Sequence, residues 1–304
     1  ATDWAFFNNN LTFTYEYYYS QSDKMLRKKL ISTENAFEAV NSNETSVVNR
    51  GHEFQFNYRP LNNKTWSLSF NGNFAINQDI TAALPDGVRQ LLIKDESNYY
   101  QDILYQLGTN TLSNVLFHYR GVYRTDDDVP VDPRTGMKYR TGGIFGADRE
   151  FRAGDPIWTD LNGDYILDEN DLVVVGNSQP KLTGGFGAFI KYKQFSLQTN
   201  FVFTIKRDIL NNALADRFRS YSNPRGLVTY DSNGKPIMPG ALVPLSQYNI
   251  WTQPGDDAYY PNPFDFIRNE LNDFYRYNQT LFQEDGSYLK FNSATFSYNF
   301  DREW

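Results

Sequence analysis

Aromatic and polar residues alternate in two consecutive segments of the chain, His52–Arg59 and Thr65–Ala75. Successive side chains of a β-strand point to opposite faces, so each segment has one aromatic face and one polar face. Pro60–Lys64 between them has the composition of a turn. The pattern predicts an antiparallel hairpin with arms of about 9 to 11 residues, the length that a membrane-spanning β-strand needs.

The same alternation recurs along the rest of the chain and predicts roughly nine strands in all. We expect hairpins where two such segments follow each other closely, as at the Asn8–Asn10 turn. The further predicted strands are Ala1–Phe7, Leu11–Tyr19, Val47–Arg59 (which includes the first arm above), Tyr99–Gly108, Asn114–Thr125, Thr183–Lys193, Gln194–Ile205 and Ser287–Phe300. Tyr99–Gly108 is expected to pair with Asn114–Thr125.

The composition favours a membrane protein. Aromatic residues make up 17% of the 304 residues, and membrane barrels carry aromatic girdles at both interfaces. The polar faces consist mostly of amides and hydroxyls, as a wet or plugged lumen requires. The mean hydropathy of −0.60 is compatible with a barrel because half of each strand is polar. No apolar run of roughly 18 residues predicts a transmembrane helix. We expect an all-β fold, part of a large antiparallel transmembrane β-barrel.

Polar segments connect the predicted strands. Two of them, Ser20–Ser46 and Asn77–Ser97, are predicted to be loops. Two others, 126–177 and 206–287, are much longer, and loops of that length are usually functional or disordered. We interpret both as extracellular loops inserted into one partial barrel domain that occupies residues 1–304.

Several functional classes are excluded or disfavoured. The absence of cysteine excludes disulfides and thiolate metal sites. The net charge of −7 argues against nucleic acid as a partner, because nucleic-acid binding needs clustered Lys and Arg. No nucleophile–base constellation and no phosphate-binding glycine loop is recognisable. We therefore expect the protein not to be an enzyme.

The most chemically specific stretch is the twelve-residue run from Asp160 to Asp171. Its oxygen donors follow the spacing of an EF-hand calcium loop, which uses positions 1, 3, 5, 7, 9 and 12. Those positions hold Asp160, Asn162, Asp164, the backbone carbonyl of Ile166, Asp168 and Asp171. Tyr165 stands where the loop prefers glycine, and Asp171 where it prefers Glu. A Ca²⁺ site and a metal-free, hydrogen-bonded Asx turn both stay open.

Aromatic residues are scattered among amides and acids in the segment 206–287. Such side chains stack on sugar rings or pack against a partner protein, and the alternative is that they pack inside the loop itself. The candidates for contact with a ligand or partner are Tyr221, Tyr248, Trp251, Tyr259 and Tyr260.

The order and spacing of five short runs along the chain together resemble the C-terminal part of SusC/RagA-type TonB-dependent outer-membrane transporters. The resemblance covers nearly the whole chain, although no single run decides it. The runs are Asn49–Glu53, Gly121–Asp126, Gly154–Pro156, Gly176–Lys181 and Asp285–Lys290.

The resemblance implies a bacterial outer-membrane protein with a barrel of about 22 strands, of which roughly nine would fall in this chain. It implies an N-terminal plug, coupling to the TonB complex, and a SusD-like surface lipoprotein acting as a hinged lid. The imported ligand would be an oligosaccharide (glycan) or a peptide, and the strands would face membrane lipid. We expect the chain to be part of a longer polypeptide that carries the plug.

Two other functions are compatible with the alternation alone. One is a soluble or surface-attached carbohydrate-binding β-sandwich that uses the loop aromatics. The other is a passive porin-type channel, which would lack a plug.

Overall fold

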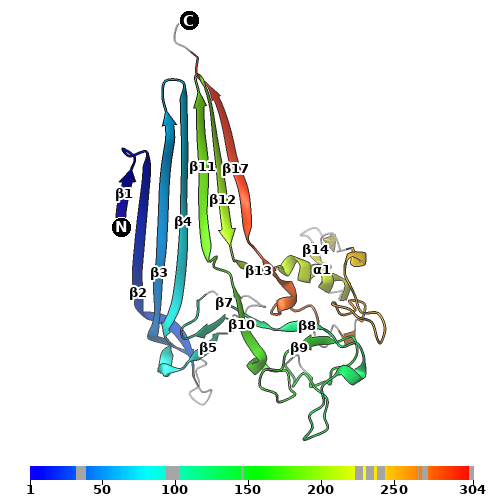
Figure 1. Ribbon diagram of the computed structural model, residues 1–304. Helices are drawn as coiled ribbons and strands as arrows, with labels where there is room; N and C mark the ends of the chain where they lie inside the picture. The colour runs from blue at the N-terminus through cyan, green and yellow to red at the C-terminus, as the bar shows by residue number, and fades with distance from the viewer. Residues whose placement is uncertain are drawn as a thin grey trace.

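A computed structural model of the chain describes residues 1–31, 39–93, 103–111, 113–144, 147–222, 229–230, 236–237, 244–265, 267–268 and 273–300. Figure 1 shows two parts: long strands lie side by side in one sheet, and many short elements gather at one end of these strands. We call the second part the distal region; it comprises the described residues of the segments 84–181 and 206–287.

Seven strands form the sheet, and every neighbouring pair is antiparallel. Their order is β1-β2-β3-β4-β11-β12-β17, so the chain leaves the sheet twice, after β4 and after β12, and builds the distal region from these two excursions. The strands are β1 (Thr2–Phe6), β2 (Leu11–Leu30), β3 (Ala39–Asn62), β4 (Trp66–Ala83), β11 (Leu182–Tyr192), β12 (Phe195–Ile205) and β17 (Tyr288–Tyr298).

The distal region contains short paired strands, 3₁₀ turns and one α-helix among its described residues. Its strands pair as β5–β6, β7–β10, β8–β9, β13–β16 and β14–β15. The elements are β5 (Gln90–Ile93), β6 (Ile103–Gln106), β7 (Ser113–Phe117), β8 (Tyr119–Val122), β9 (Pro156–Trp158), β10 (Leu172–Asn177), β13 (Asp208–Leu210), α1 (Asn212–Ser222), β14 (Thr229–Tyr230), β15 (Pro236–Ile237) and β16 (Gln283–Asp285), with 3₁₀ turns at Pro85–Gly87, Asp126–Asp128, Glu169–Asp171, Leu245–Gln247 and Thr280–Phe282. None of the described helices has the length and apolarity that crossing a membrane requires.

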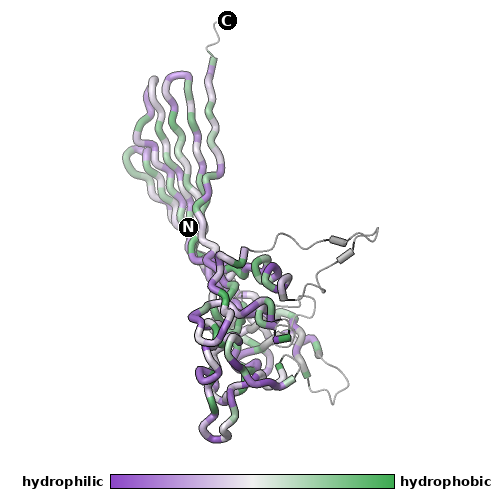
Figure 2. Tube along the Cα trace, turned by 90° about the vertical axis from the view of Figure 1, so that its right-hand side faces the viewer, coloured by the Kyte–Doolittle hydropathy of each residue, from purple (hydrophilic) through white to green (hydrophobic). Residues whose placement is uncertain are grey.

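The predicted alternation is confirmed in the sheet. Aromatic rings of neighbouring strands stack on one face, with ring centroids 4.7 Å apart for Phe54 and Phe74 and 4.9 Å apart for Phe186 and Phe201. Phe186 remains 42% exposed, and Figure 2 shows the sheet standing clear of the distal region, with green and purple alternating along its strands. A β-sandwich would bury this aromatic face under a second sheet, so the exposed face weighs against the sandwich alternative.

The strands are longer than predicted. The segment Ser20–Ser46, predicted to be a loop, instead continues β2 to Leu30 and starts β3 at Ala39, with β-bulges after Ser22 and Met25; its residues 32–38 lie outside the described residues. The predicted loop Asn77–Ser97 is also partly strand, since β4 runs to Ala83. Backbone pairing satisfies N–H and C=O groups whatever the side chains are, so polar composition alone did not end these strands.

Two further strand predictions are wrong. The sheet holds seven strands in the described residues rather than roughly nine. The expected pairing of Tyr99–Gly108 with Asn114–Thr125 does not occur among the described residues, because β6 pairs with β5 and β7 pairs with β10. The partner of β6 is a nearby segment that the sequence assigned to a loop, whereas β7 pairs with β10, a segment distant in sequence that packing in the distal region brings alongside.

Candidate functional site

The two long insertions fold together into one unit. Aromatic side chains from 126–177 and from 206–287 share a single hydrophobic core. Side chains of β7, β8 and the 3₁₀ turn Thr280–Phe282 also belong to this core. The buried members are Phe117, Tyr119, Tyr123, Val129, Tyr139, Phe151, Trp158, Leu167, Ala215, Phe218, Phe274, Tyr275, Tyr277, Leu281 and Phe282. The insertions therefore form one packed distal region rather than two independent loops.

A cavity of about 410 Å³ opens beside this core. Its walls combine rings from the core with charged side chains, as ligand pockets commonly do. It is lined by Arg120, Tyr123, Asp128, Pro130, Tyr139, Ile157, Trp158, Thr159 and Asp160. The cavity is the candidate ligand site of the distal region.

The three charged residues of the cavity differ in their bonding. Asp128 accepts hydrogen bonds from the backbone N and the Oγ1 of Thr125, both at 2.8 Å, and these bonds hold the pKa of Asp128 below its usual value. Asp160 also accepts bonds from backbone N–H groups. Arg120 is exposed, and its guanidinium makes no hydrogen bond or ion pair with the described residues. Arg120 is therefore the cavity group most able to bind an anionic part of a ligand.

The run Asp160–Asp171 closes on itself through backbone hydrogen bonds to its acidic side chains. Asp160 accepts from the N–H of Gly163 at 2.7 Å and of Tyr165 at 2.9 Å. Asn162 accepts from the N–H of Asp164, and Asp164 from that of Ile166 at 2.8 Å. The contacts of Asn162 and Asp164, each with the N–H two residues on, are Asx turns, in which a side-chain oxygen replaces a backbone acceptor.

The second half of the run is held by Asp171, which is fully buried. One of its oxygens accepts from the N–H of Leu161 and the other from the N–H of Asp168, and Asp168 in turn accepts from the N–H of Asn170. Burial raises the pKa of Asp171. Tyr165 has a φ of 64°, the left-handed conformation that the corresponding glycine of an EF-hand adopts.

These hydrogen bonds favour the Asx-turn alternative for the run. Within the described part of the chain, no group of three His, Cys, Asp or Glu side chains is arranged to hold a metal ion. The carboxylates of Asp160 and Asp171 already bond backbone N–H groups with both oxygens. A calcium site at Asp160, Asn162, Asp164, Ile166, Asp168 and Asp171 stays a prediction.

The five candidate aromatics of 206–287 divide by their packing. Tyr221, Tyr248 and Tyr260 pack against the hydrophobic core, and the ring of Tyr260 lies 5.2 Å from that of Phe218. Tyr259 is 44% exposed, although its carbonyl accepts a hydrogen bond from the hydroxyl of Tyr119.

Trp251 lies over Gly154, and a Cβ added at that glycine would come within 2.7 Å of the indole. Of the five predicted contact residues Tyr259 is the exposed one and Trp251 is half-buried against Gly154; their role stays a prediction.

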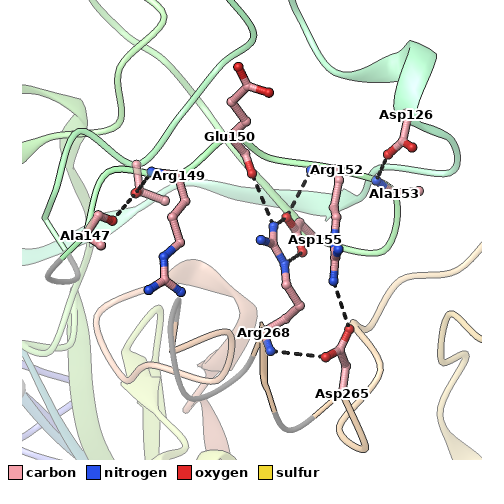
Figure 3. A network of polar contacts seen from close by, with 10 residues as sticks. Asp126, Ala147, Arg149, Glu150, Arg152, Ala153, Asp155, Asp265 and Arg268 are labelled. Carbon is pink, nitrogen blue, oxygen red and sulfur yellow. Dashed lines mark hydrogen bonds and ion pairs between the residues drawn. The ribbon is translucent and has the colours of Figure 1, made fainter.

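A buried ion pair joins the two insertions, and the sequence did not reveal it. Arg268 donates from Nε and Nη2 to the carboxylate of Asp155, and from Nη2 to the carbonyl of Glu150 (Figure 3). Both side chains are almost completely buried, and burial lowers the pKa of Arg268 to about 10. Asp155 lies in the run Gly154–Pro156, but no local pattern indicates a partner more than a hundred residues away.

Comparison with known proteins finds similarity to TonB-dependent receptors. No protein-family model matches the chain. TonB-dependent receptor P3 of Formosa agariphila is 24% identical to it over 308 residues, which cover 98% of this chain and 26% of the receptor. TonB-dependent receptor P39 of the same organism is 26% identical over 282 residues, which cover 86% of this chain and 25% of the receptor.

Solved structures share the fold. A chain of the RagAB peptide transporter superimposes with a TM-score of 0.60 at 18% identity, over 97% of this chain and 28% of that one. The RagAB peptide importer in its open-open state gives a TM-score of 0.62 at 18% identity, over 96% of this chain and 26% of that one. The chain is similar to TonB-dependent receptors. This similarity confirms the predicted family resemblance.

The chain spans about a quarter of the length of the TonB-dependent receptors that it matches. The matched proteins are named as receptors, a transporter and an importer rather than as enzymes, in agreement with the prediction of a non-enzymatic protein. The long antiparallel sheet and the distal region together correspond to one segment of such a receptor.

Proposed function

We propose that the chain is part of an active importer of the bacterial outer membrane, of the SusC/RagA type, with peptides as its ligands. The observation that carries this proposal is the similarity to the RagAB peptide transporter over nearly the whole chain, sheet and distal region alike. The strands would contribute part of the barrel wall, and the distal region would form the extracellular loops 126–177 and 206–287.

The dimensions of the aromatic face support a position in the membrane. Ten residue steps separate Trp66 from Ile76 on β4, about 33 Å at roughly 3.3 Å per residue. A strand tilt of about 40° reduces this to about 25 Å, the height of the apolar band of outer-membrane barrels. Trp66 and Tyr192 pack against each other at one edge of the band with ring centroids 4.4 Å apart, as in an aromatic girdle.

Peptide is preferred over oligosaccharide for two reasons. The structural relative is named a peptide transporter. Arg120 offers a guanidinium that no described residue pairs, beside aromatic walls, which suits the carboxylate of a peptide. Lid closure by a SusD-like lipoprotein over the distal region and energy from the TonB complex complete the proposal.

The test is uptake of labelled peptides by cells that produce the full-length receptor. We expect peptide uptake to stop when an uncoupler collapses the proton-motive force. Peptide uptake should exceed the uptake of labelled oligosaccharides, and Arg120→Gln should lower it. Arg134, whose guanidinium already bonds Asp132, provides the matched control Arg134→Gln. Uptake that persists with the uncoupler would instead identify a passive porin-type channel.

A further inference from the structure

Two adjacent rows of side chains cross the aromatic face near the distal end of β2, β3 and β4. Strand pairing places Tyr17, His52 and Ile76 in one row, and Tyr19, Arg50 and Gln78 in the next. Both rows share the face of Phe54, because Arg50 and His52 are an even number of residues from it along β3. Arg50 is therefore a charged residue on a face that is otherwise largely aromatic and apolar.

The charge of Arg50 is not neutralised by any described neighbour. Its Nε and Nη2 donate to Oε1 of Gln78 at 3.2 and 2.9 Å, and an amide oxygen carries no net charge. Glu53 and Asp79 point to the opposite face of the sheet, being an odd number of residues from the aromatic positions. Asp23 lies in the β-bulge after Ser22, where its carboxylate accepts a hydrogen bond from Gln21, and no ion pair joins Arg50 to a carboxylate among the described residues.

A cavity of about 310 Å³ lies at this point of the aromatic face. Tyr17, Arg50, His52, Ile76 and Gln78 line it. The rings of Tyr17 and His52 lie 5.1 Å apart, and Ile76 is exposed beside them. The cavity thus has an apolar and aromatic wall on the side of the band and a guanidinium on the distal side.

This order of groups matches the boundary between hydrocarbon and lipid headgroups. Tyr side chains gather at such interfaces because the ring is apolar and the hydroxyl is polar. A guanidinium one row farther out reaches the phosphates, and it binds them through several N–H donors at once. Gln78 uses only two of those donors, and no described residue takes the others.

We propose that the cavity formed by Tyr17, Arg50, His52, Ile76 and Gln78 binds a phosphate-bearing lipid of the membrane, with its phosphate on Arg50 and its acyl chain along the band. The inference rests on the proposed function, since it requires the aromatic face to lie in a membrane. The site lies on the outside of the sheet and is separate from the cavity at Arg120.

The test uses the full-length receptor in phosphatidylcholine nanodiscs with and without lipid A, and native mass spectrometry counts the lipid A retained. We expect Arg50→Gln to weaken lipid A binding about fivefold, the effect of one cation near an anionic lipid surface, and Arg50→Lys to retain most of it. Lys191, an exposed cation on the opposite face of β11, provides the control Lys191→Gln, which should bind lipid A normally.

Three comparisons among the variants and the competing anion would overturn the inference. These are unchanged lipid A retention with Arg50→Gln, an equal loss with Lys191→Gln, and displacement of lipid A by inorganic phosphate at equal concentration, which would make the site one for free anions. Unchanged melting temperatures of the variants exclude misfolding. A receptor that enters nanodiscs but binds no lipid A refutes this inference alone, whereas a receptor that stays in buffer refutes the proposed function.

Discussion

Gly154 occupies a position that only glycine fits. Its φ is 84°, and an added Cβ would meet the indole of Trp251 at 2.7 Å. We expect Gly154→Ala to destabilise the distal region by about 2 kcal/mol, because overpacking adds to left-handed backbone strain. Urea unfolding of the full-length protein, followed by tryptophan fluorescence, measures the effect.

Gly163 provides the matched control. Its φ of 73° is similar, but no atom lies within 4 Å of an added Cβ. Gly163→Ala should therefore cost about 1 kcal/mol, from backbone strain alone. Equal losses for the two variants would show that the contact between Trp251 and Gly154 contributes nothing.

Asp171 is the second position where one residue decides local structure. Asp171→Asn replaces an acceptor by an NH₂ group, which then faces the N–H of Leu161 or Asp168. A buried donor without a partner costs about 1–3 kcal/mol, and we expect a loss of stability of that size. Asp127→Asn, at an exposed position of the same region, should change stability little.

The same carboxyl predicts a pH dependence. Burial raises the pKa of Asp171, so the folded state holds this proton more firmly than the unfolded chain. The contribution of the protonated Asp171 to the free energy of unfolding is fully present below the ordinary carboxyl pKa. It is lost as the pH rises through the raised pKa of the folded state. Asp171→Asn should remove this part of the slope when stability is measured against pH; an unchanged slope would contradict the assignment.

Calcium binding at Asp160–Asp171 is tested by one measurement. Backbone N–H groups satisfy the carboxylates of Asp160 and Asp171 without a metal. We therefore expect saturating EDTA to leave the melting temperature unchanged. A fall with EDTA that Ca²⁺ reverses, and that Asp160→Asn abolishes, would establish the calcium site instead.

At the scale of elements, the ion pair between Asp155, directly before β9, and Arg268 connects the first insertion to the second. Arg268→Met leaves the carboxylate of Asp155 buried without its counter-charge, and loss of one partner of a buried pair costs about 3–5 kcal/mol. We expect a loss of that order in urea unfolding. Arg134→Met, at a guanidinium that is largely exposed, should cost less than about 1 kcal/mol.

The double variant Asp155→Asn with Arg268→Met separates the causes. If the uncompensated charge produces the loss, the double variant is more stable than the sum of the two single losses predicts. Additive losses would mean that the two side chains do not interact.

The elements differ in how far their own sequence predicted them. The hairpin of β11 and β12 was predicted within one residue at each end, because alternation and turn residues are local signals. The predicted ends of β2, β3 and β4 fell short of the observed ones. Their polar residues continue to form backbone hydrogen bonds with the neighbouring strand. The short strands β6 and β7 were found, but their partners come from other segments of the distal region.

At the scale of the whole molecule, the aromatic face is the feature on which the membrane assignment depends. Phe186→Arg places a charge in the middle of the proposed apolar band, which costs about 2–4 kcal/mol in a membrane barrel. We expect the full-length variant to fold into detergent or bilayers much less efficiently than wild type, as followed by membrane fractionation.

The control for this prediction lies on the other face of the same hairpin. Gln198 is exposed and an odd number of residues from Phe201, so its side chain points away from the aromatic face. Gln198→Arg should integrate normally. Equal integration of both variants, or a wild-type protein that partitions into buffer, would contradict a membrane position for the sheet.

The sequence alone determined where the seven sheet strands lie, their aromatic face and the family resemblance, because period-two alternation and short runs are properties of neighbouring residues. Tertiary structure decided how the two insertions combine: their aromatics, among them Tyr248 and Tyr260, share one core, and Arg268 meets Asp155 across 113 positions. Such contacts form when segments distant in sequence pack together and are buried from water, and no local sequence pattern predicts which segments these are.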